Sequence, residues 1–389
     1  MVRTRLTYIL IALIALAVFV CTNAFAALVV FIAALALPIA CKIAVKRQAK
    51  GVSMRCSCVG AATVDGELAL TIAIRRPKAL LKGRIELEFE STNLLTRSKS
   101  SVPVVLGISE EKTEVYHLRL STRCCGCCAI KLTAARLRDP LGLTSVPLDL
   151  SYEGTYTVYP PLCELDIASS QLLQNNATGA AYDMTRKGQD QTEIFDLRAY
   201  EQTDTIASIH WKATAKVDKL MVREASWPVD YDVMLLCDAR MPHISNDDEV
   251  RALNATMAAA ASLSLALCTS GQSHCVGYVE AGELAAVPVQ LRENFDAALD
   301  ALMSMPLSDE PLADAAAFQL YQRSHAITRA ILVSSAPSDE LAQQLAATTN
   351  LAVVVVEDAA EQQQACENYL RTSIPASRLL AGRVKSVVI

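Results

Sequence analysis

The sequence predicts a membrane helical hairpin, then an antiparallel β-sandwich, then an α/β domain with a mostly parallel sheet. Three observations predict this order: an uncharged apolar run near the N-terminus, a stretch of alternating apolar and polar residues, and apolar strands that alternate with helical segments. We place the hairpin at 1–50, the sandwich at 55–162, a linker at 163–191 and the α/β domain at 192–389. A hydrophobic content of 52% excludes a disordered chain.

The first apolar run predicts two membrane spans. Residues 6–41 contain no charged side chain. One helix of this length would extend roughly 54 Å, whereas a hydrocarbon core is about 30 Å thick. Two spans of about 17 residues fit, with a turn near Thr22-Asn23. Because Arg3 and Arg5 precede the spans and a basic segment, 42–50, follows them, we expect the cytoplasmic (inner) membrane, with the soluble domains in the cytoplasm.

A signal peptide is the alternative for the first span. Arg3 and Arg5 would form its basic region, 8–20 its apolar region and Ala24-Phe25-Ala26 its cleavage site. A cleaved chain would keep 27–41 as a span, so the soluble domains would stay on the same side. The 13 cysteines fit a reducing compartment.

The segment that follows the spans alternates with a period of two. The clearest runs are 67–74, 84–90, 115–120 and 129–134. Such runs predict strands with one buried and one solvated face, and several at short spacing predict an antiparallel sandwich.

Four cysteines lie between two of these strands, in the run Cys124-Cys125-Gly126-Cys127-Cys128. Their C-x-x-C spacing is typical of zinc ligands, and Cys56 and Cys58 could add more. Neighbouring residues on a strand point to opposite faces, however, so four thiols in this run cannot easily close one tetrahedron. We therefore favour a tight hairpin around Gly126, with zinc binding as the alternative.

The C-terminal half alternates strands and helices. An apolar strand at 231–238 ends in Asp238, and a helix rich in alanine and leucine follows at 247–269. Further strands are expected at 274–279, 330–334 and 351–356, and further helices at 293–304, 312–323, 338–348 and 358–370. This alternation predicts a parallel sheet covered on both faces, with functional sites at the carboxyl ends of its strands.

The segment 192–224, with Arg198, Tyr200 and the run Ile209-His210-Trp211-Lys212-Ala213, resembles the signature of the domain-of-unknown-function 58 family. Upstream, Asp139-Pro140-Leu141-Gly142-Leu143 and Val158-Tyr159-Pro160-Pro161 are similar to its other motifs, and paired membrane spans belong to the same pattern. The resemblance covers 1–240 in order. The matching signature residues are Arg198, Tyr200, Asp204, Ile209, Trp211, Lys212, Ala213, Ala215, Leu220 and Glu224. The chain departs from the signature at Thr203, Ala207, Ser208 and Lys216. These changes argue against an anionic ligand or partner contact at these positions.

The residues of this signature also predict a short helix. Asp204 is placed to cap a helix over 205–214, and Ile206, Ile209 and Ala213 would share its buried face. Trp211 lies beside that stripe, so we expect it to be a core anchor, with an exposed binding role as the alternative. His210, a lone histidine beside a tryptophan, is expected to pack rather than to catalyse.

The resemblance implies a von Willebrand factor A-like C-terminal domain. The metal site of such domains uses Asp-x-Ser-x-Ser, whose oxygens suit Mg²⁺. Here the run is Asp238-Ala239-Arg240-Met241-Pro242, so both serines are replaced and an arginine lies beside the one remaining ligand. We expect no working metal site, with Asp238 the only candidate left.

The function expected is that of a non-catalytic, membrane-anchored interaction protein without cofactors. The sequence lacks a phosphate-binding loop, a G-x-S-x-G elbow and an H-E-x-x-H motif, and its net charge of −5 without basic runs disfavours nucleic acid. The resemblance implies a MoxR-type AAA+ ATPase as partner, in assembly or maturation of envelope or protein complexes, and less directly a transglutaminase-like membrane protein. The expected partner-binding residues are Arg198, Tyr200, Asp204, Trp211 and Lys212. The alternative function is a metal-dependent hydrolase that uses Asp238.

Overall fold

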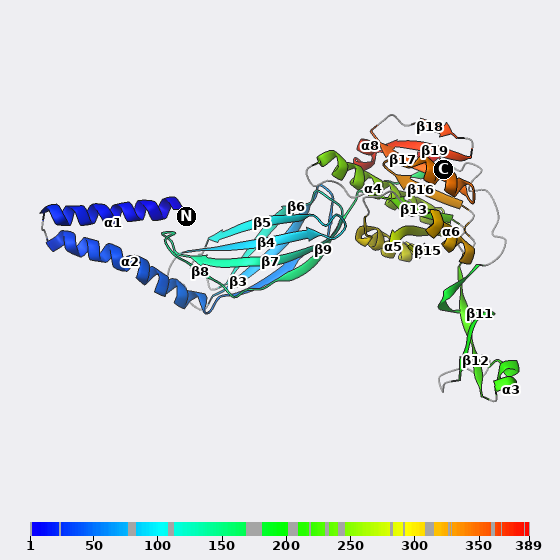
Figure 1. Cartoon of the computed structure of the whole chain (residues 1–389), viewed down its shortest axis with the longest axis horizontal. Helices are drawn as coiled ribbons and strands as arrows, with labels where there is room; N and C mark the ends of the chain where they lie inside the picture. The colour runs from blue at the N-terminus through cyan, green and yellow to red at the C-terminus, as the bar shows by residue number, and fades with distance from the viewer. Residues whose placement is uncertain are drawn as a thin grey trace. The chain divides into compact units, whose positions relative to one another are not determined.

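The computed structural model forms two compact units, Met1–Tyr159 and Pro160–Ile389, and Figure 1 labels most of their elements. Two apolar helices come first, and a strand-rich body with mixed sheets follows. The structure describes residues 2–388 except 23–24, 77–82, 108–112, 169–180, 201–208, 218, 230–232, 240–245, 281–282, 291, 308–314, 326, 328, 359–361, 367 and 385.

The N-terminal helices are α1 (Val2–Thr22) and α2 (Phe25–Ala49). They pack on each other, and the Tyr8 hydroxyl of α1 donates to the Ala34 carbonyl of α2 at 2.6 Å. Both expose many large apolar side chains. The second helix is long and apolar enough to cross a membrane, and the first has a shorter apolar stretch, Leu6–Thr22. Such exposed surface is stable in lipid rather than in water, so the pair indicates membrane association.

Two sheets follow in the same unit. The first has the order β1-β3-β6 and is antiparallel throughout: β1 (Ser53–Cys58), β3 (Glu67–Arg75) and β6 (Thr113–Ser121). The second has the order β2-β9-β7-β4-β5, with β8 beside β7: β2 (Ala61–Thr63), β9 (Glu153–Tyr159), β7 (Gly126–Arg138), β4 (Arg84–Asn93), β5 (Lys99–Gly107) and β8 (Ser145–Pro147). The pair β2–β9 is parallel, unlike the antiparallel arrangement expected.

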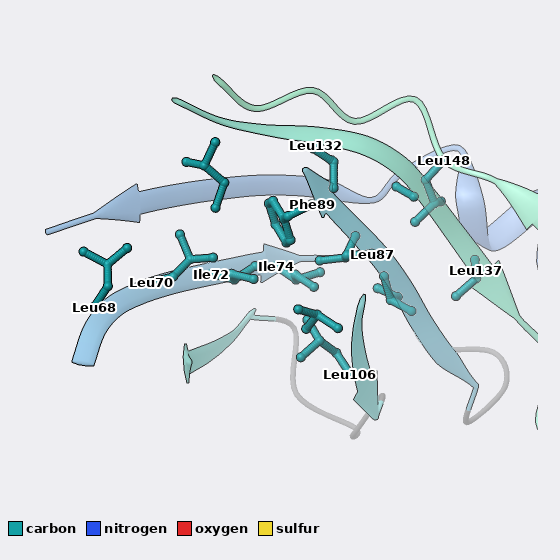
Figure 2. Packing of buried hydrophobic residues seen from close by; sticks show 14 of the residues in the cluster. Leu68, Leu70, Ile72, Ile74, Leu87, Phe89, Leu106, Leu132, Leu137 and Leu148 are labelled. Carbon is teal, nitrogen blue, oxygen red and sulfur yellow. The ribbon is translucent and has the colours of Figure 1, made fainter. Parts of the chain in front are cut away.

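The two sheets bury one common core. Alternate side chains of β3 and β4 point into it, and Figure 2 shows Leu70, Ile72, Leu87 and Phe89 at its centre. This is the pattern that the period-two runs predict. Val45, near the end of α2, belongs to the same cluster and is 1% exposed. The membrane helix therefore ends inside the core of the domain that it carries.

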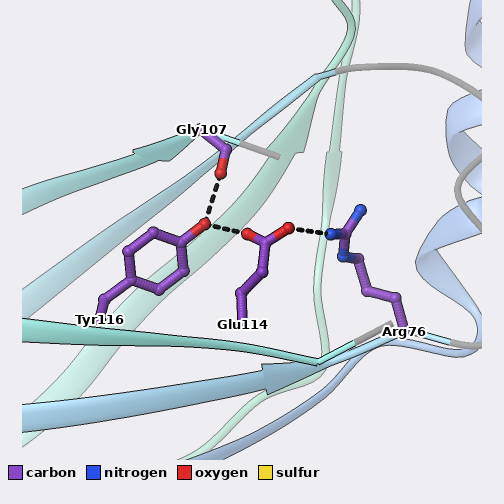
Figure 3. A network of polar contacts seen from close by, with 4 residues as sticks. All are labelled: Arg76, Gly107, Glu114 and Tyr116. Carbon is purple, nitrogen blue, oxygen red and sulfur yellow. Dashed lines mark hydrogen bonds and ion pairs between the residues drawn. The ribbon is translucent and has the colours of Figure 1, made fainter. Parts of the chain in front are cut away.

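A buried ion pair ties the two sheets together at one end (Figure 3). The Arg76 guanidinium lies 2.5 Å from a Glu114 carboxylate oxygen. The Tyr116 hydroxyl lies between the other Glu114 oxygen and the carbonyl of Gly107, to which the distance is 2.5 Å. Burial, followed by the bond to Glu114, raises the pKa of Tyr116 to about 12, so this hydroxyl keeps its proton at neutral pH. The network joins β3 and β6 of one sheet to β5 of the other.

The cysteine run does not form the hairpin that was expected. Because β6 and β7 belong to different sheets, residues 122–125 cross from one sheet to the other. The buried Asn93 organises this crossing: its amide nitrogen donates to the Cys125 carbonyl at 2.9 Å, and its amide oxygen accepts from the backbone of Leu95. Within the described part of the chain, no group of three or more His, Cys, Asp or Glu residues could hold a metal ion.

Gly126 allows this crossing, because its φ is +125° and a Cβ there would lie 2.8 Å from the Leu95 Cβ. We predict that Gly126→Ala destabilises the N-terminal unit by about 1–3 kcal/mol, through backbone strain and overpacking. Gly60→Ala is the matched control, because nothing lies within 4 Å of a Cβ at Gly60. Hydrogen exchange of β4 and β7 in the full-length protein measures the effect, and equal exchange in both variants would contradict it.

The second unit contains a seven-stranded sheet of order β15-β14-β13-β16-β17-β19-β18. Five central strands are parallel, and β15 and β18 are antiparallel edges. The strands are β13 (Val233–Asp238), β14 (His274–Glu280), β15 (Glu283–Val289), β16 (Arg329–Ser334), β17 (Asn350–Glu357), β18 (Gln362–Ala365) and β19 (Tyr369–Pro375). The helices are α4 (Asp247–Thr269), α5 (Arg292–Ser304), α6 (Ala315–Ser324), α7 (Asp339–Ala346) and α8 (Ala376–Leu380).

One helix prediction near the C-terminus is wrong, and the segment predicted as a linker contains strands. The helix expected at 358–370 is replaced by β18 and the start of β19, because pairing along the sheet edge outweighs the helix propensity of its Gln and Glu residues. The linker expected at 163–191 contains strand β10 (Asp166–Ala168), which pairs with β20 (Ser386–Val388), and the start of β11. Cys163 is buried, and its N–H donates to the Ser262 hydroxyl of α4 at 2.9 Å.

Helix α4 is apolar enough to cross a membrane, but most of it is buried inside the unit. Its Ser264 hydroxyl lies 2.8 Å from Nε2 of His274, the first residue of β14. Nδ1 of this ring lies 3.0 Å from the Gln272 carbonyl, which can only accept, so Nδ1 carries the proton and Nε2 accepts from serine. Burial lowers the pKa of His274 to about 4, and the ring is neutral at pH 7.

We predict that the second unit loses stability on acidification. The ordinary histidine pKa is 6.5, so between about pH 6.5 and 4 the unfolded chain binds a proton that folded His274 excludes. The free energy of unfolding is unaffected by His274 above about pH 6.5, and it falls by about 3 kcal/mol as the pH decreases to 4. Hydrogen exchange of β13 and β14 against pH measures the slope. His274→Gln should flatten this slope, and an unchanged slope in His274→Gln would contradict the assignment.

Candidate functional site

Four of the expected partner-binding residues, Arg198, Tyr200, Trp211 and Lys212, lie on one hairpin and its end, whereas Asp204 lies outside the described residues. Strands β11 (Ala181–Ala199) and β12 (Met221–Val229) pair antiparallel with several register shifts. Between them lies the short helix α3 (Trp211–Val217). Ile209 forms a bridge with Val222, and Arg198 pairs with the same residue from the other side. The segments at 198, 209 and 222 therefore lie next to one another.

Backbone and side-chain bonds fix α3 on this hairpin. The His210 N–H donates to the Met221 carbonyl at 2.8 Å, and the Thr214 hydroxyl accepts from the Met221 N–H at 3.0 Å. The His210 ring caps the helix, because its Nδ1 accepts from the Ala213 N–H at 3.0 Å. This bond uses the nitrogen lone pair that a general base would need, so His210 has a structural role here.

The helix predicted over 205–214 is therefore wrong in its bounds. Ile209 is part of a β-bridge, His210 is the cap, and the helix begins at Trp211. Asp204 and Ile206, to which we gave capping and core roles, lie outside the described residues. Ile209 is buried as expected, but on the strand side of the hairpin rather than on a helix face.

The structure overturns the core role expected for Trp211. Its side chain is 62% exposed at the start of α3, because the helix begins here and the buried position belongs to Ile209. Lys212 is exposed as well, and Tyr200 is half-buried, with its N–H donating to the Leu220 carbonyl at 2.9 Å. Arg198 is placed by its strand, but its side chain is outside the described residues.

Three residues that follow Trp211 in the chain, and that were not predicted as binding residues, are exposed too. Lys216 lies in the last turn of the helix, and Lys219 and Leu220 lead into β12. We define the α3 surface as Trp211, Lys212, Lys216, Lys219 and Leu220. It combines two apolar side chains with three cations. Spacing alone did not reveal it, since the pattern of apolar residues does not say which of them a short helix leaves in solvent.

Asp238 ends β13 next to the end of β16, where it pairs with Ser334. The Ser334 hydroxyl donates to an Asp238 carboxylate oxygen at 2.8 Å and accepts from the Ala336 N–H at 3.2 Å. Both side chains are buried. Residues 240–245, which include Arg240, lie outside the described residues. Beside Asp238, Cys237 is buried too, and burial raises the pKa of its thiol, which disfavours it as a nucleophile.

Comparison with known families gives one match. The family described as "Protein of unknown function DUF58" matches residues 196–365, which include the hairpin end, α3 and most of the seven-stranded sheet. The part of the resemblance that lies in this segment thus has independent support. No curated protein matches the chain.

Solved structures give only weak likenesses. One is a cohesin module of a family 33 glycoside hydrolase from Clostridium perfringens, 13% identical over 28% of this chain and 96% of that chain, with a TM-score of 0.21. Another is a β-glucosidase from Listeria innocua, 10% identical over 28% of this chain and 16% of that chain, with a TM-score of 0.20. A third is a superoxide reductase from Ignicoccus hospitalis, 13% identical over 27% of this chain and 80% of that chain, with a TM-score of 0.18. Scores this low carry no argument.

We predict that Trp211→Ala costs less than about 1 kcal/mol of stability, because the side chain is largely in solvent. Ile209→Ala should cost about 2–4 kcal/mol, since Ile209 is buried against Val222. Hydrogen exchange of the β12 amides in the full-length protein measures both. A loss of protection in Trp211→Ala as large as in Ile209→Ala would restore the core role of the tryptophan.

Proposed function

We propose that this protein is a non-catalytic, membrane-anchored interaction protein whose α3 surface binds a partner protein. The observation that carries the proposal is the exposure of Trp211 among three exposed lysines. Tryptophan is enriched at the centres of protein interfaces, and a 62% exposed tryptophan on a short, well-capped helix is already held in place for binding. The lysines favour an acidic partner surface.

The partner that we propose is a MoxR-type AAA+ ATPase, acting in the assembly or maturation of envelope or protein complexes. The support is the match to the family of unknown function over 196–365, together with the resemblance of the hairpin sequence to that family. We also assign the second unit to the von Willebrand factor A-like class. Its parallel strands, with Asp238 at the carboxyl end of β13, support this assignment.

An interaction role is favoured over hydrolysis by the environment of Asp238. A metal ligand must offer its carboxylate oxygens to the ion, whereas one Asp238 oxygen accepts from Ser334 in a buried pair. The run after Asp238 also lacks the serines of the expected metal site. The same strand end can serve as a structural tie between β13 and β16.

We place the soluble units in the cytoplasm, next to an inner membrane. The support is the basic segment after α2, in which Lys42, Lys46, Arg47 and Lys50 are all exposed. An ATPase of the AAA+ class would be reached on this side, where ATP is available.

We predict that the pair Trp211→Ala and Lys212→Glu lowers recovery of the partner at least tenfold in a mild-detergent pull-down read by mass spectrometry. The tryptophan supplies the apolar anchor, and the reversed charge repels an acidic surface. The chain should fold as before, because both side chains are exposed.

The matched control is Leu320→Ala with Arg292→Glu. Leu320 is 62% exposed, as Trp211 is, and Arg292 is exposed too, but neither belongs to the α3 surface. The control should recover the wild-type partners. If the α3 variant recovers those partners at the wild-type level, docking at this surface is excluded.

A further inference from the structure

The turn Asp139–Thr144 is built more rigidly than an ordinary surface loop. The Asp139 carboxylate accepts from the Thr144 N–H at 3.0 Å, and the Asp139 N–H donates to the Thr144 carbonyl at 3.3 Å. Inside the turn, the Gly142 N–H donates to the Asp139 carbonyl at 3.1 Å, and Gly142 has a φ of +69°. Asp139 is buried, whereas Pro140 and Leu141 are exposed. The turn therefore presents an apolar tip on a fixed base.

This turn lies beside the membrane helix. Strand β8, which follows it, packs on α2, and Asp139 is near enough to Cys41 of α2 to interact with it electrostatically. Cys41 directly precedes Lys42, the first cation of α2. It lies about 24 Å along the helix from Phe25. A hydrocarbon core is about 30 Å thick, so Cys41 is expected near its cytoplasmic boundary. Val45, one turn further on, is fixed in the sandwich core.

The exposed groups described at this end of the sandwich include an apolar side chain and several cations. Leu141 is 49% exposed at the tip. The Arg84 guanidinium reaches over the turn, 3.4 Å from where a Cβ on Gly142 would lie. Arg84, Arg75, Lys42 and Lys46 are all exposed.

Two nearby glutamates are paired with arginines. Glu86 lies 2.6 Å from Arg138, and Glu114 lies 2.5 Å from Arg76. Asp139 is buried in the turn. Among the described residues at this end, the exposed charged groups named above are cationic.

We propose that the Asp139–Thr144 turn is a second membrane contact: Leu141 enters the interfacial layer of the bilayer, and Arg84 binds the headgroups of anionic phospholipids. The occupant is a lipid surface, because the turn lies beside the helix that enters the bilayer. An apolar side chain flanked by cations is the composition that such interfaces attract. The inference rests on the membrane anchoring in the proposed function, but not on partner docking.

The test places single tryptophans in the full-length protein, reconstituted in nanodiscs that contain brominated phosphatidylglycerol. Bromine on the acyl chains quenches tryptophan only where the ring meets the bilayer. Difference emission against the wild-type chain, which has two tryptophans of its own, isolates the added residue. Leu141→Trp should be quenched at least threefold more strongly than Leu94→Trp.

Leu94 is the matched control. It is 50% exposed in the turn after β4, so its exposure equals that of Leu141. It lies at the other end of this ten-residue strand, about 30 Å from Arg84. Quenching of Leu141→Trp no stronger than that of Leu94→Trp would overturn the proposal.

Ile32→Trp, exposed in the middle of α2, must be quenched strongly. Without that signal the anchoring itself is wrong, and the turn cannot contact lipid. This outcome differs from a failed pull-down, which concerns the α3 surface alone.

The headgroup part is tested by Arg84→Glu in the Leu141→Trp chain. Quenching should fall at least twofold in brominated phosphatidylglycerol and remain unchanged in brominated phosphatidylcholine, which carries no net charge. Equal quenching with and without Arg84→Glu in the anionic lipid would exclude the headgroup contact.

Discussion

The burial of Val45 in the sandwich core is the constraint on which the N-terminal unit depends. A membrane helix that ends in a flexible linker would let its domain move freely above the bilayer. Here the last turns of α2 carry Val45 into the same apolar cluster as Phe89 and Leu137, so separating the helix from the sandwich would expose a core side chain. The distance between the last apolar residue of the span and the first strand is then fixed by packing, and one end of the sandwich is held at the membrane surface.

Buried polar groups specify how the strands and helices pair in both units. Arg76 and Glu114 are costly to bury, and their ion pair, together with the hydrogen bond from the Tyr116 hydroxyl to Glu114, offsets that cost. Tyr116 also bonds to Gly107 in the other sheet, so the network joins strands from both sheets. Asn93 has the same role in the cysteine crossing, as His274 has between α4 and β14. Each of these groups would be left unsatisfied by a shift of its strand, so each one specifies a single register.

Much of this fold was predictable because period-two patterns and apolar strands are local signals. The runs at 67–74 and 84–90 became β3 and β4, and the helix at 247–269 became α4. Edge strands were not predictable, since β18 exists only because β19 offers it a partner. The site was predicted in part: the hairpin residues were found by resemblance, but the exposure of Trp211 depends on where α3 begins, and that is set by the bond between Ala213 and the His210 ring.

In the described part of the chain, three titratable side chains that would suggest catalysis have structural roles. The Asp238 carboxylate joins β13 to β16 through Ser334, His274 joins α4 to β14, and the His210 ring caps α3. By contrast, the exposed groups on α3 and on the Asp139–Thr144 turn are an apolar side chain flanked by cations, on segments that hydrogen bonds hold rigid. Such groups contribute binding energy without proton transfer. This contrast between the three buried or capping groups and the two exposed surfaces supports the binding role that we propose.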